Sequence, residues 1–307
     1  MKRRDFIKYC TSSSAWMLAQ GMPIRNWDKE EVIKLTILHT NDVHSRIDPF
    51  PMDGSRLQGL GGVASRATLI NQIRKAEKNV LLLDSGDIFQ GTPYFNMYLG
   101  EVEMKSMSAL GYDAATIGNH DFDGGMENLK KQLNHARFPL INSNYNFKDT
   151  TLSGTVKEYI VKEIDGLRIG IFGLGIELQG LVPKNLYGNT SYEDPVVKGN
   201  SIASFLKNEV KCDYLICLSH LGYSYKEQKI SDVSLAPQLN YVDLILGGHT
   251  HTFLDRAILS KNKNGNPLII NQVGWAGVML GRIDISFERN NSRHKCKTCK
   301  NEWIIDA

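Results

Sequence analysis

Residues that could bind metal ions follow five short apolar runs in this chain of 307 residues. The runs are residues 35–39, 80–83, 114–117, 214–218 and 242–246. Side chains two apart on an extended segment point to the same side, so Asp42 and His44 could bind one ion together. The same spacing applies to His249 and His251. In open α/β architectures the carboxyl ends of the strands meet at one edge of the sheet, and ligand-binding sites form there.

The residue types after these runs indicate which metals would bind. Carboxylates beside imidazoles suit divalent Mn, Fe, Zn or Co better than Ca²⁺, which prefers oxygen ligands alone. Any single histidine is more simply explained as a core or surface residue, but five at strand ends favour a site. His39 lies inside the first strand and is predicted to be structural. His135 and His294 are predicted to face solvent.

The elements that must position these residues alternate between strands and helices in the first half and are richer in strands later. Residues 63–73 have helical spacing, and residues 159–164 and 167–174 predict a β-hairpin around Asp165-Gly166. A second helix is predicted to end at Gly111, and its apolar residues are expected in the core: Met97, Met104, Met107 and Leu110. The glycines of residues 170–175 lack the spacing of a dinucleotide site and predict close backbone packing instead.

Composition and charge argue against a nucleic-acid-binding protein. The net charge is +3 with 22% charged residues, and the dispersed Lys and Arg residues predict no nucleic-acid surface.

Residues 1–27, with Arg3-Arg4 near the start, resemble a twin-arginine export signal, which predicts a periplasmic or cell-envelope protein. A basic, frayed terminus is the alternative. No segment reaches transmembrane length.

The remaining chain is predicted to be one catalytic domain, residues 28–290, followed by residues 291–307 as a polar tail or a short added strand. Cys296 and Cys299 predict a local disulfide or free thiols rather than a metal knuckle, because no second Cys pair is present. Cys212 and Cys217 are predicted to be core or edge residues of a strand.

Taken in order, the motifs resemble those of calcineurin-like metallophosphoesterases. They are residues 42–44, 86–91, 118–123, 219–220 and 248–251. The closer resemblance is to the 5′-nucleotidase branch. It is carried by Thr40-Asn41, Gln90-Gly91, Phe122-Asp123 and residues 274–282. The resemblance covers about residues 33–287.

This resemblance implies a mixed α/β fold, a four-layer α-β-β-α sandwich of two mixed sheets, with two divalent metal ions of unknown identity (Mn, Zn, Fe or Co). By matching motif positions, the first ion is assigned Asp42, His44 and His251. The second is assigned Asn119, His220 and His249, with Asp87 bridging both ions. His120 would act on the substrate as general acid, oriented by Asp123.

The implied activity is metal-dependent hydrolysis of phosphoesters, with 5′-nucleotides or related small phosphomonoesters as substrates. Two close cations lower the pKa of a shared water and neutralise phosphoryl oxygens, and protonated His120 would protonate the leaving alkoxide. Two alternatives remain open: a phosphodiesterase for cyclic nucleotides or nucleotide-sugars, and a catalytic subunit that needs a partner chain. The second arises because relatives in this branch carry a C-terminal nucleotide-binding domain, whereas this chain ends at Ala307. Arg46 could contact a phosphate or lie on the surface.

Overall fold

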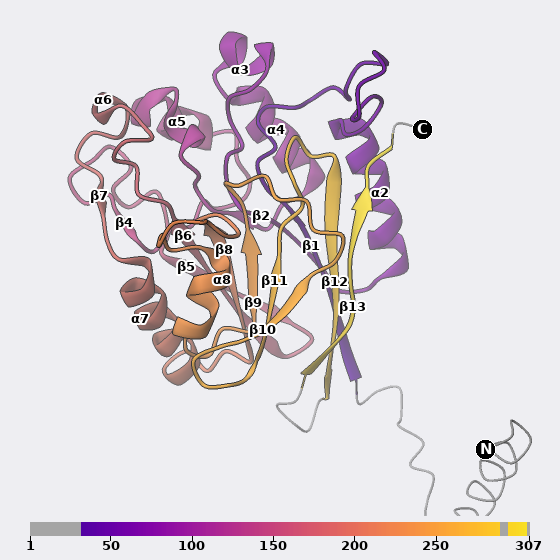
Figure 1. Ribbon diagram of the computed structural model, residues 1–307, viewed down its shortest axis with the longest axis vertical. Coiled ribbons are helices and arrows are strands. Elements are labelled where there is room, and N and C mark those ends of the chain that lie inside the picture. The colour runs from indigo at the N-terminus through magenta and orange to yellow at the C-terminus, as the bar shows by residue number, and fades with distance from the viewer. Residues whose placement is uncertain (1–31, 289–293, 306–307) are drawn as a thin grey trace, which may run out of the picture.

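Two mixed sheets form the centre of the protein in the computed structural model, which describes residues 32–288 and 294–305 (Figure 1). The first sheet has the order β13 (His294–Trp303), β12 (Met279–Glu288), β1 (Val32–Thr40), β2 (Val80–Asp84) and β3 (Ala114–Ala115). The second has the order β10 (Ile258–Lys261), β11 (Pro267–Asn271), β9 (Leu244–Gly247), β8 (Tyr214–His220), β6 (Leu167–Gly175) and β5 (Tyr159–Ile164). A separate ribbon pairs β4 (Tyr145–Asn146) with β7 (Ser191–Tyr192).

Helices cover the outer faces of both sheets. The described helices are α2 (Val63–Ala76), α3 (Pro93–Tyr98), α4 (Glu101–Leu110), the 3₁₀ turn η2 (His120–Phe122), α5 (Gly125–Leu133), α6 (Lys184–Tyr187), α7 (Pro195–Asn208), α8 (Asp232–Leu235) and η3 (Ala236–Gln238). Figure 1 shows the two sheets between α2 on one side and α7 on the other. The predicted four-layer mixed α/β architecture is therefore confirmed.

Side chains that point alternately to the two faces of each strand explain why each sheet packs on the other sheet with one face and on helices with the other. Leu35 and Ile37 of β1 point into the core between the two sheets, whereas Leu38 points to the helices outside the first sheet. In β8, Ile216 faces the same central core and Cys217 faces the helices outside the second sheet. Because successive side chains of a strand point to opposite faces, a strand buried on both faces is apolar throughout.

The parallel pairing of the strands places their carboxyl ends together. In the first sheet β1, β2 and β3 run parallel, with Thr40 opposite Asp84. In the second sheet β6, β8 and β9 run parallel, with Ser219 opposite Gly247. The hydroxyl of Ser85, just after β2, donates to the carbonyl of Leu246 in β9 over 2.8 Å, which joins the two sheets at this edge.

Several local predictions are confirmed. Strands β5 and β6 form the predicted hairpin, in which Asp165 and Gly166 have φ of 50° and 86°. A side chain at Gly173 would collide with the carbonyl of Ile141, which is the close backbone packing expected in this strand. Cys212 and Cys217 are buried free thiols. The polar C-terminal segment pairs along β12 as β13.

The prediction of one helix from Met97 to Leu110 is wrong in one respect, because the chain forms two helices there, α3 and α4. Leu99 and Gly100 both adopt left-handed conformations, with φ of 53° and 103°, and end α3 before α4 begins. A Cβ at Gly100 would collide with the ring of Phe89. Met97 therefore lies on the short helix α3 and is 71% exposed, whereas Met104 is completely buried.

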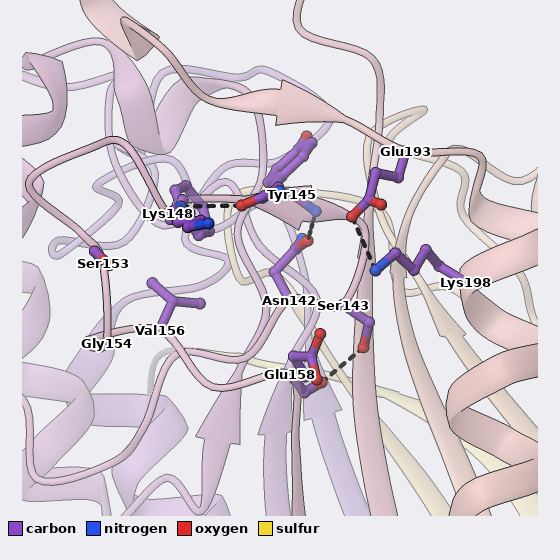
Figure 2. Close-up of a pocket in the computed structure, with 12 residues that line it drawn as sticks. Asn142, Ser143, Tyr145, Lys148, Ser153, Gly154, Val156, Glu158, Glu193 and Lys198 are labelled. Atoms are coloured by element: carbon purple, nitrogen blue, oxygen red, sulfur yellow. Dashed lines mark hydrogen bonds and ion pairs between the residues drawn. The ribbon is translucent and has the colours of Figure 1, made fainter.

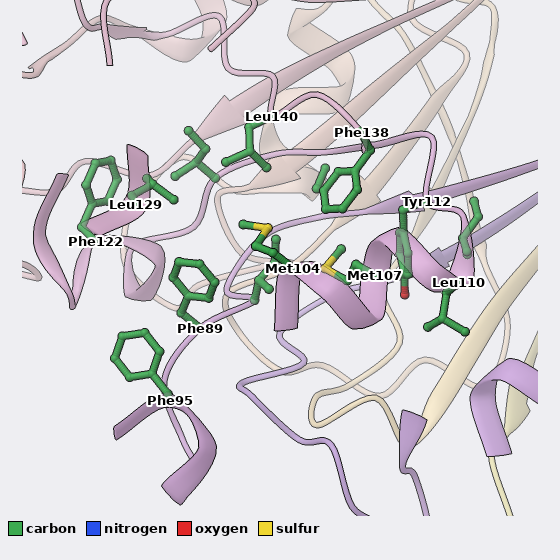
Figure 3. Close-up of a cluster of buried hydrophobic side chains, with 14 of the residues drawn as sticks. Phe89, Phe95, Met104, Met107, Leu110, Tyr112, Phe122, Leu129, Phe138 and Leu140 are labelled. Atoms are coloured by element: carbon green, nitrogen blue, oxygen red, sulfur yellow. The ribbon is translucent and has the colours of Figure 1, made fainter. Parts of the chain in front are cut away.

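This difference predicts unequal effects of two identical substitutions. Figure 3 shows Met104 and Met107 among the aromatic rings of the core between the first sheet and its helices. We expect Met104→Ala to lower the free energy of unfolding by about 2–5 kcal/mol, because it leaves a cavity. Met97→Ala should change it by less than about 0.5 kcal/mol, because its side chain is exposed. Urea titration of both variants checks this, and equal losses would contradict the division into two helices.

Two predictions depend on residues whose placement is not described. Residues 1–27, the predicted export signal, lie outside the described ranges, and so does the side chain of Cys296. Cys299 is disulfide-bonded. Among the helices that the structure describes, none is both long enough and apolar enough to cross a membrane.

Candidate metal centre

Asp42, His44 and His251 converge from loops that follow β1 and β9. The Nε2 atoms of His44 and His251 lie 3.0 Å apart, and Nε2 of His251 lies 3.5 Å from Oδ1 of Asp42. Among the residues that the structure describes, these three form one of two groups whose donor atoms lie within 4.8 Å of one another. The two nitrogens that face each other, with a carboxylate beside them, are the arrangement of ligands around a cation.

Asp87, His220 and His249 form the second group. Nε2 of His220 lies 3.1 Å from Oδ2 of Asp87, and Nδ1 of His249 lies 2.8 Å from the amide oxygen of Asn119. Asp87 also faces the first group, since the same Oδ2 is 3.8 Å from Nε2 of His44. The structure thus brings together all seven residues that the motifs assign to two ions.

The backbone at the proposed ligands is unusual. Left-handed φ values occur at Asp42 (49°), His44 (50°), Asp87 (56°), His249 (73°) and His251 (52°). Such conformations cost on the order of 1 kcal/mol or more each outside glycine and cluster at functional sites. Hydrogen bonds between the loops hold them: the amide of Asp42 donates to the carbonyl of Gly86 over 2.9 Å, and that of His44 to the carbonyl of Asp87 over 3.0 Å.

Outer contacts fix the ring orientation of two of the histidines. Nδ1 of His220 lies 2.6 Å from the carbonyl of Ser85, and Nδ1 of His44 lies 3.2 Å from the carbonyl of Gln90. A carbonyl only accepts, so Nδ1 carries a hydrogen, and Nε2 is the nitrogen that faces the site. Nε2 of His220 is buried and faces Oδ2 of Asp87 at 3.1 Å.

The protonation states of the site also suit a cation. Burial lowers the pKa of His249 to about 3 and that of His251 to about 4, with nearby histidines adding to the effect, so both rings are neutral ligands at pH 7. Burial raises the pKa of Asp42, because its charged form has lost water. Burial has the same tendency at Asp87, but the positive charge of His220 holds the pKa of that carboxyl below its usual range. Asp87 in turn raises the pKa of His220 to about 10, against the effect of burial, so a cation bound here would take the place of the proton on His220. A buried carboxylate here draws positive charge to itself.

These observations test the residues against two metal ions, and the residues fit. The donors are carboxylates and imidazoles, Nε2 of the buried His220 lies 3.1 Å from a carboxylate oxygen of Asp87, and two imidazole nitrogens face each other at 3.0 Å. Asp87 lies between the two groups, as a bridging ligand requires.

His120 lies beside the proposed metal ligands without belonging to either group. Its Nδ1 lies 2.8 Å from Oδ2 of Asp123, and its backbone amide donates to Oδ1 of Asp87 over 2.8 Å. Its side chain is 39% exposed, so Nε2 can reach a bound molecule. The hydrogen bond to Asp123 raises the pKa of His120, against the effect of partial burial. This pairing favours the protonated imidazole.

Sequence reasoning gave no role to Asp121, which organises the loop before it. This buried carboxylate accepts hydrogen bonds from the backbone amides of Ile88 (2.8 Å), Phe89 (3.1 Å) and Gly118 (2.8 Å). Burial raises its pKa to about 7, with Asp87 adding to the effect. Its position inside the motif of residues 118–123 was the only signal, and that signal does not distinguish a ligand from a support.

The other histidines have separate environments. His39 is completely buried, and its Nε2 lies 2.8 Å from the amide nitrogen of Asn271, in keeping with a structural role. His135 is partly exposed and lies 4.0 Å from Glu101. The side chain of His294 is outside the described residues. Arg46, left open by the sequence, places its guanidinium carbon 4.1 Å from the centre of the Phe50 ring.

A pocket of about 320 Å³ lies elsewhere, beside β4 and the start of α7 (Figure 2). Asn142, Ser143 and Tyr145 line its inner part, and an ion pair of 2.9 Å joins Glu193 to Lys198 at its rim. None of the proposed metal ligands contributes to this pocket.

Comparison with known proteins gives the relationship directly. Calcineurin-like phosphoesterase is the family that matches residues 35–253. The snake venom 5′-nucleotidase of Crotalus adamanteus is 36% identical over 275 residues, which are 83% of this chain and 45% of that protein. The 5′-nucleotidase of Homo sapiens is 36% identical over 246 residues, 78% of this chain and 41% of that protein. The chain thus spans about half the length of these curated relatives.

Solved structures agree in fold. The 5′-nucleotidase precursor from Thermus thermophilus superposes with a TM-score of 0.77 and 30% identity, covering 89% of this chain and 54% of that one. NAD nucleotidase from Haemophilus influenzae has a TM-score of 0.77 and 25% identity, covering 90% of this chain and 51% of that one. From its matching domain and the extent of these similarities, the chain belongs to the calcineurin-like phosphoesterase family.

Proposed function

We propose that this protein hydrolyses 5′-nucleotides or related small phosphomonoesters with two divalent metal ions. The observation that carries the proposal is the convergence of the seven ligand side chains next to the His120–Asp123 pair. The similarity to proteins named 5′-nucleotidase supports the substrate class.

In the proposed reaction each residue has a distinct task. When bound, two divalent ions neutralise phosphoryl oxygens and lower the pKa of water to near neutrality. Asp42, His44 and His251 would hold one ion, and Asn119, His220 and His249 the other, with Asp87 between them. His120 would donate the proton on Nε2 to the departing alkoxide, since Nδ1 is engaged with Asp123.

A substrate panel tests this proposal. The chain is stripped with EDTA, reloaded with Mn²⁺, Zn²⁺, Fe²⁺ or Co²⁺, and assayed on adenosine 5′-monophosphate, glycerol phosphate, a cyclic nucleotide and a nucleotide-sugar. The proposal expects monoester hydrolysis that disappears with EDTA and returns with metal. No hydrolysis of any monoester by metal-loaded protein would overturn it, unless adding a partner chain restores activity, which would identify a catalytic subunit.

Diester hydrolysis is a second candidate. The names of two relatives include substrates or activities beyond a 5′-nucleotidase: NAD nucleotidase of Haemophilus influenzae and the trifunctional nucleotide phosphoesterase YfkN of Bacillus subtilis, which is 30% identical over 295 residues. Faster turnover of the nucleotide-sugar or the cyclic nucleotide than of adenosine 5′-monophosphate in the same panel would select this function.

The pH dependence of turnover should report the His120–Asp123 pair. Because the carboxylate of Asp123 raises the pKa of His120, the general acid stays protonated to higher pH. Asp123→Asn removes the charge, so we expect the alkaline limb of the kcat profile to move to lower pH. Profiles of both proteins on adenosine 5′-monophosphate measure the shift. An alkaline limb that stays in place would contradict the role of Asp123.

Export is part of the proposal and rests on the sequence of residues 1–27. Replacing Arg3 and Arg4 together by lysine keeps the charge but removes the arginine pair that the export receptor reads. We expect the double variant to accumulate in the cytoplasmic fraction of bacterial cells, and the wild-type protein in the periplasmic fraction. Equal distribution of both proteins would contradict a twin-arginine signal.

A further inference from the structure

His251 differs from the other histidine ligands in how its ring is held. Nδ1 of His44 and of His220 each contacts a backbone carbonyl, and Nδ1 of His249 lies beside Asn119. Within the described part of the chain, the side chain of His251 makes its polar contacts through Nε2 alone, at 3.0 Å to His44 and 3.5 Å to Asp42. It is also 39% exposed, compared with 8% for His44 and 0% for His220. Ligand histidines normally need an outer partner that fixes the ring.

An indole takes the place of that partner. The ring of Trp275 stacks on the ring of His251, with centroids 5.6 Å apart and planes 7° from parallel. Phe50 packs almost perpendicular to Trp275 at 5.9 Å, and the guanidinium of Arg46 covers Phe50. The imidazole is therefore held by a continuous row of rings that ends in a cation.

Hydrogen bonds join the backbone around Trp275 to the segment that carries Asp42, which belongs to the same proposed group of ligands as His251. The amide of Ala276 donates to the carbonyl of Asp42 over 2.7 Å, and the side chain of Asn41 donates to the carbonyl of Gly274 over 2.6 Å. A displacement of Trp275 relative to Asp42 would break these bonds. The loop thus fixes the distance between Asp42 and His251, two ligands that are far apart in sequence.

We propose that Trp275 is a positioning residue for the first metal ion, the one assigned to Asp42, His44 and His251. It orients the exposed ring of His251 by stacking, where His44 and His220 use hydrogen bonds to backbone carbonyls. This inference rests on the proposed metal centre but not on the identity of the substrate. It predicts that loss of the indole weakens one ion and leaves the ion of His220 and His249 in place.

Metal titration of the full chain tests the selectivity. In Trp275→Leu we expect one of the two ions to bind about 10–100-fold more weakly, the range seen when an outer partner of a ligand is lost. Trp275→Phe keeps a flat aromatic ring, so its affinity for both ions should stay close to that of the wild type. Trp303→Leu is the matched control, because Trp303 stacks on Phe253 at 5.7 Å and 15° rather than on a ligand. Isothermal titration with Mn²⁺, together with metal analysis after gel filtration, gives both affinities.

Fluorescence provides a readout that a general loss of stability would not produce. Paramagnetic Co²⁺ bound at His251 should quench the emission of the stacked indole. We expect this quenching to persist in Trp303→Phe and to disappear in Trp275→Phe. Quenching that is unchanged in Trp275→Phe would overturn the proposal.

The outcomes separate this inference from the proposed function. Unchanged affinities in Trp275→Leu, or equal weakening of both ions with a lower melting temperature, would overturn the positioning role. A wild-type chain that binds two ions but hydrolyses no phosphoester would overturn the proposed function alone. A wild-type chain that binds no ions would overturn both.

Discussion

Replacing His120 by asparagine is expected to lower kcat for adenosine 5′-monophosphate by about 10²–10⁴-fold, the usual contribution of a general acid. The reason is geometric: His120 bonds to Asp123 through Nδ1, which leaves Nε2 free to donate a proton to the leaving oxygen. Because His120 belongs to neither group of ligands, both ions should stay bound. Steady-state kinetics and metal analysis of the same preparation measure the two effects.

The leaving group makes this test specific. Nitrophenol is a weak base and leaves without a proton, so His120→Asn should be far less impaired on nitrophenyl phosphate than on adenosine 5′-monophosphate. His135→Asn is the matched control, since His135 contacts Glu101 outside the site and should have wild-type kinetics. An equal loss on both substrates, or loss of metal from His120→Asn, would contradict the assignment of a general acid.

Replacing Asp87 by asparagine is expected to have the largest effect on metal binding. Oδ2 of Asp87 lies 3.1 Å from Nε2 of His220 and 3.8 Å from Nε2 of His44, so it serves both groups. An amide removes the negative charge and one of the oxygens. We expect affinity for both ions to fall by more than the 10–100-fold typical of changes around a ligand. Hydrolysis of every substrate should fall with it.

Asp84→Asn is the control for this variant. Asp84 is also completely buried and lies three residues earlier, but it accepts hydrogen bonds from Thr40 and from the amide of Gly86 and belongs to neither group. Asp84→Asn should retain both ions in isothermal titration, even if its melting temperature falls. Two tightly bound ions in Asp87→Asn would show that Asp87 is not the bridging ligand.

The positions of the proposed metal ligands could be predicted because two simple rules place them. Apolar strands buried on both faces form parallel pairs, and parallel strands end at one edge. His220 is the last residue of β8, and His249 follows β9 by two residues, so a short distance between them follows once β8 and β9 are neighbours. The division of the proposed ligands between two ions came from the family resemblance. Spacing alone paired His249 with His251 at one ion, which is wrong, because the structure places them in different groups.

Contacts that depend on tertiary packing could not be predicted. Met97 has the same spacing relative to Met104 that a single helix would give, but left-handed Leu99 and Gly100 separate them because the Phe89 ring packs against Gly100. Asp121 supports the loop because four backbone amides donate to its carboxylate, those of Asp87, Ile88, Phe89 and Gly118. Neither residue type nor spacing distinguishes these cases.

Trp275 illustrates the same limit at the site itself. The segment of residues 274–282 contributes to the family resemblance, but nothing in its composition places an indole on His251. That contact exists because Ala276 and Gly274 bond to Asp42 and Asn41, which lie more than two hundred residues earlier. Roles of this kind become visible only when distant loops are seen together.

Anomalous diffraction from crystals grown with Mn²⁺ tests the central claim most directly. We expect two peaks about 3.5–4 Å apart. Asp87 should lie between them, with Asp42, His44 and His251 around one and Asn119, His220 and His249 around the other. A single peak, or peaks that these seven side chains do not contact, would contradict a dimetal phosphoesterase site.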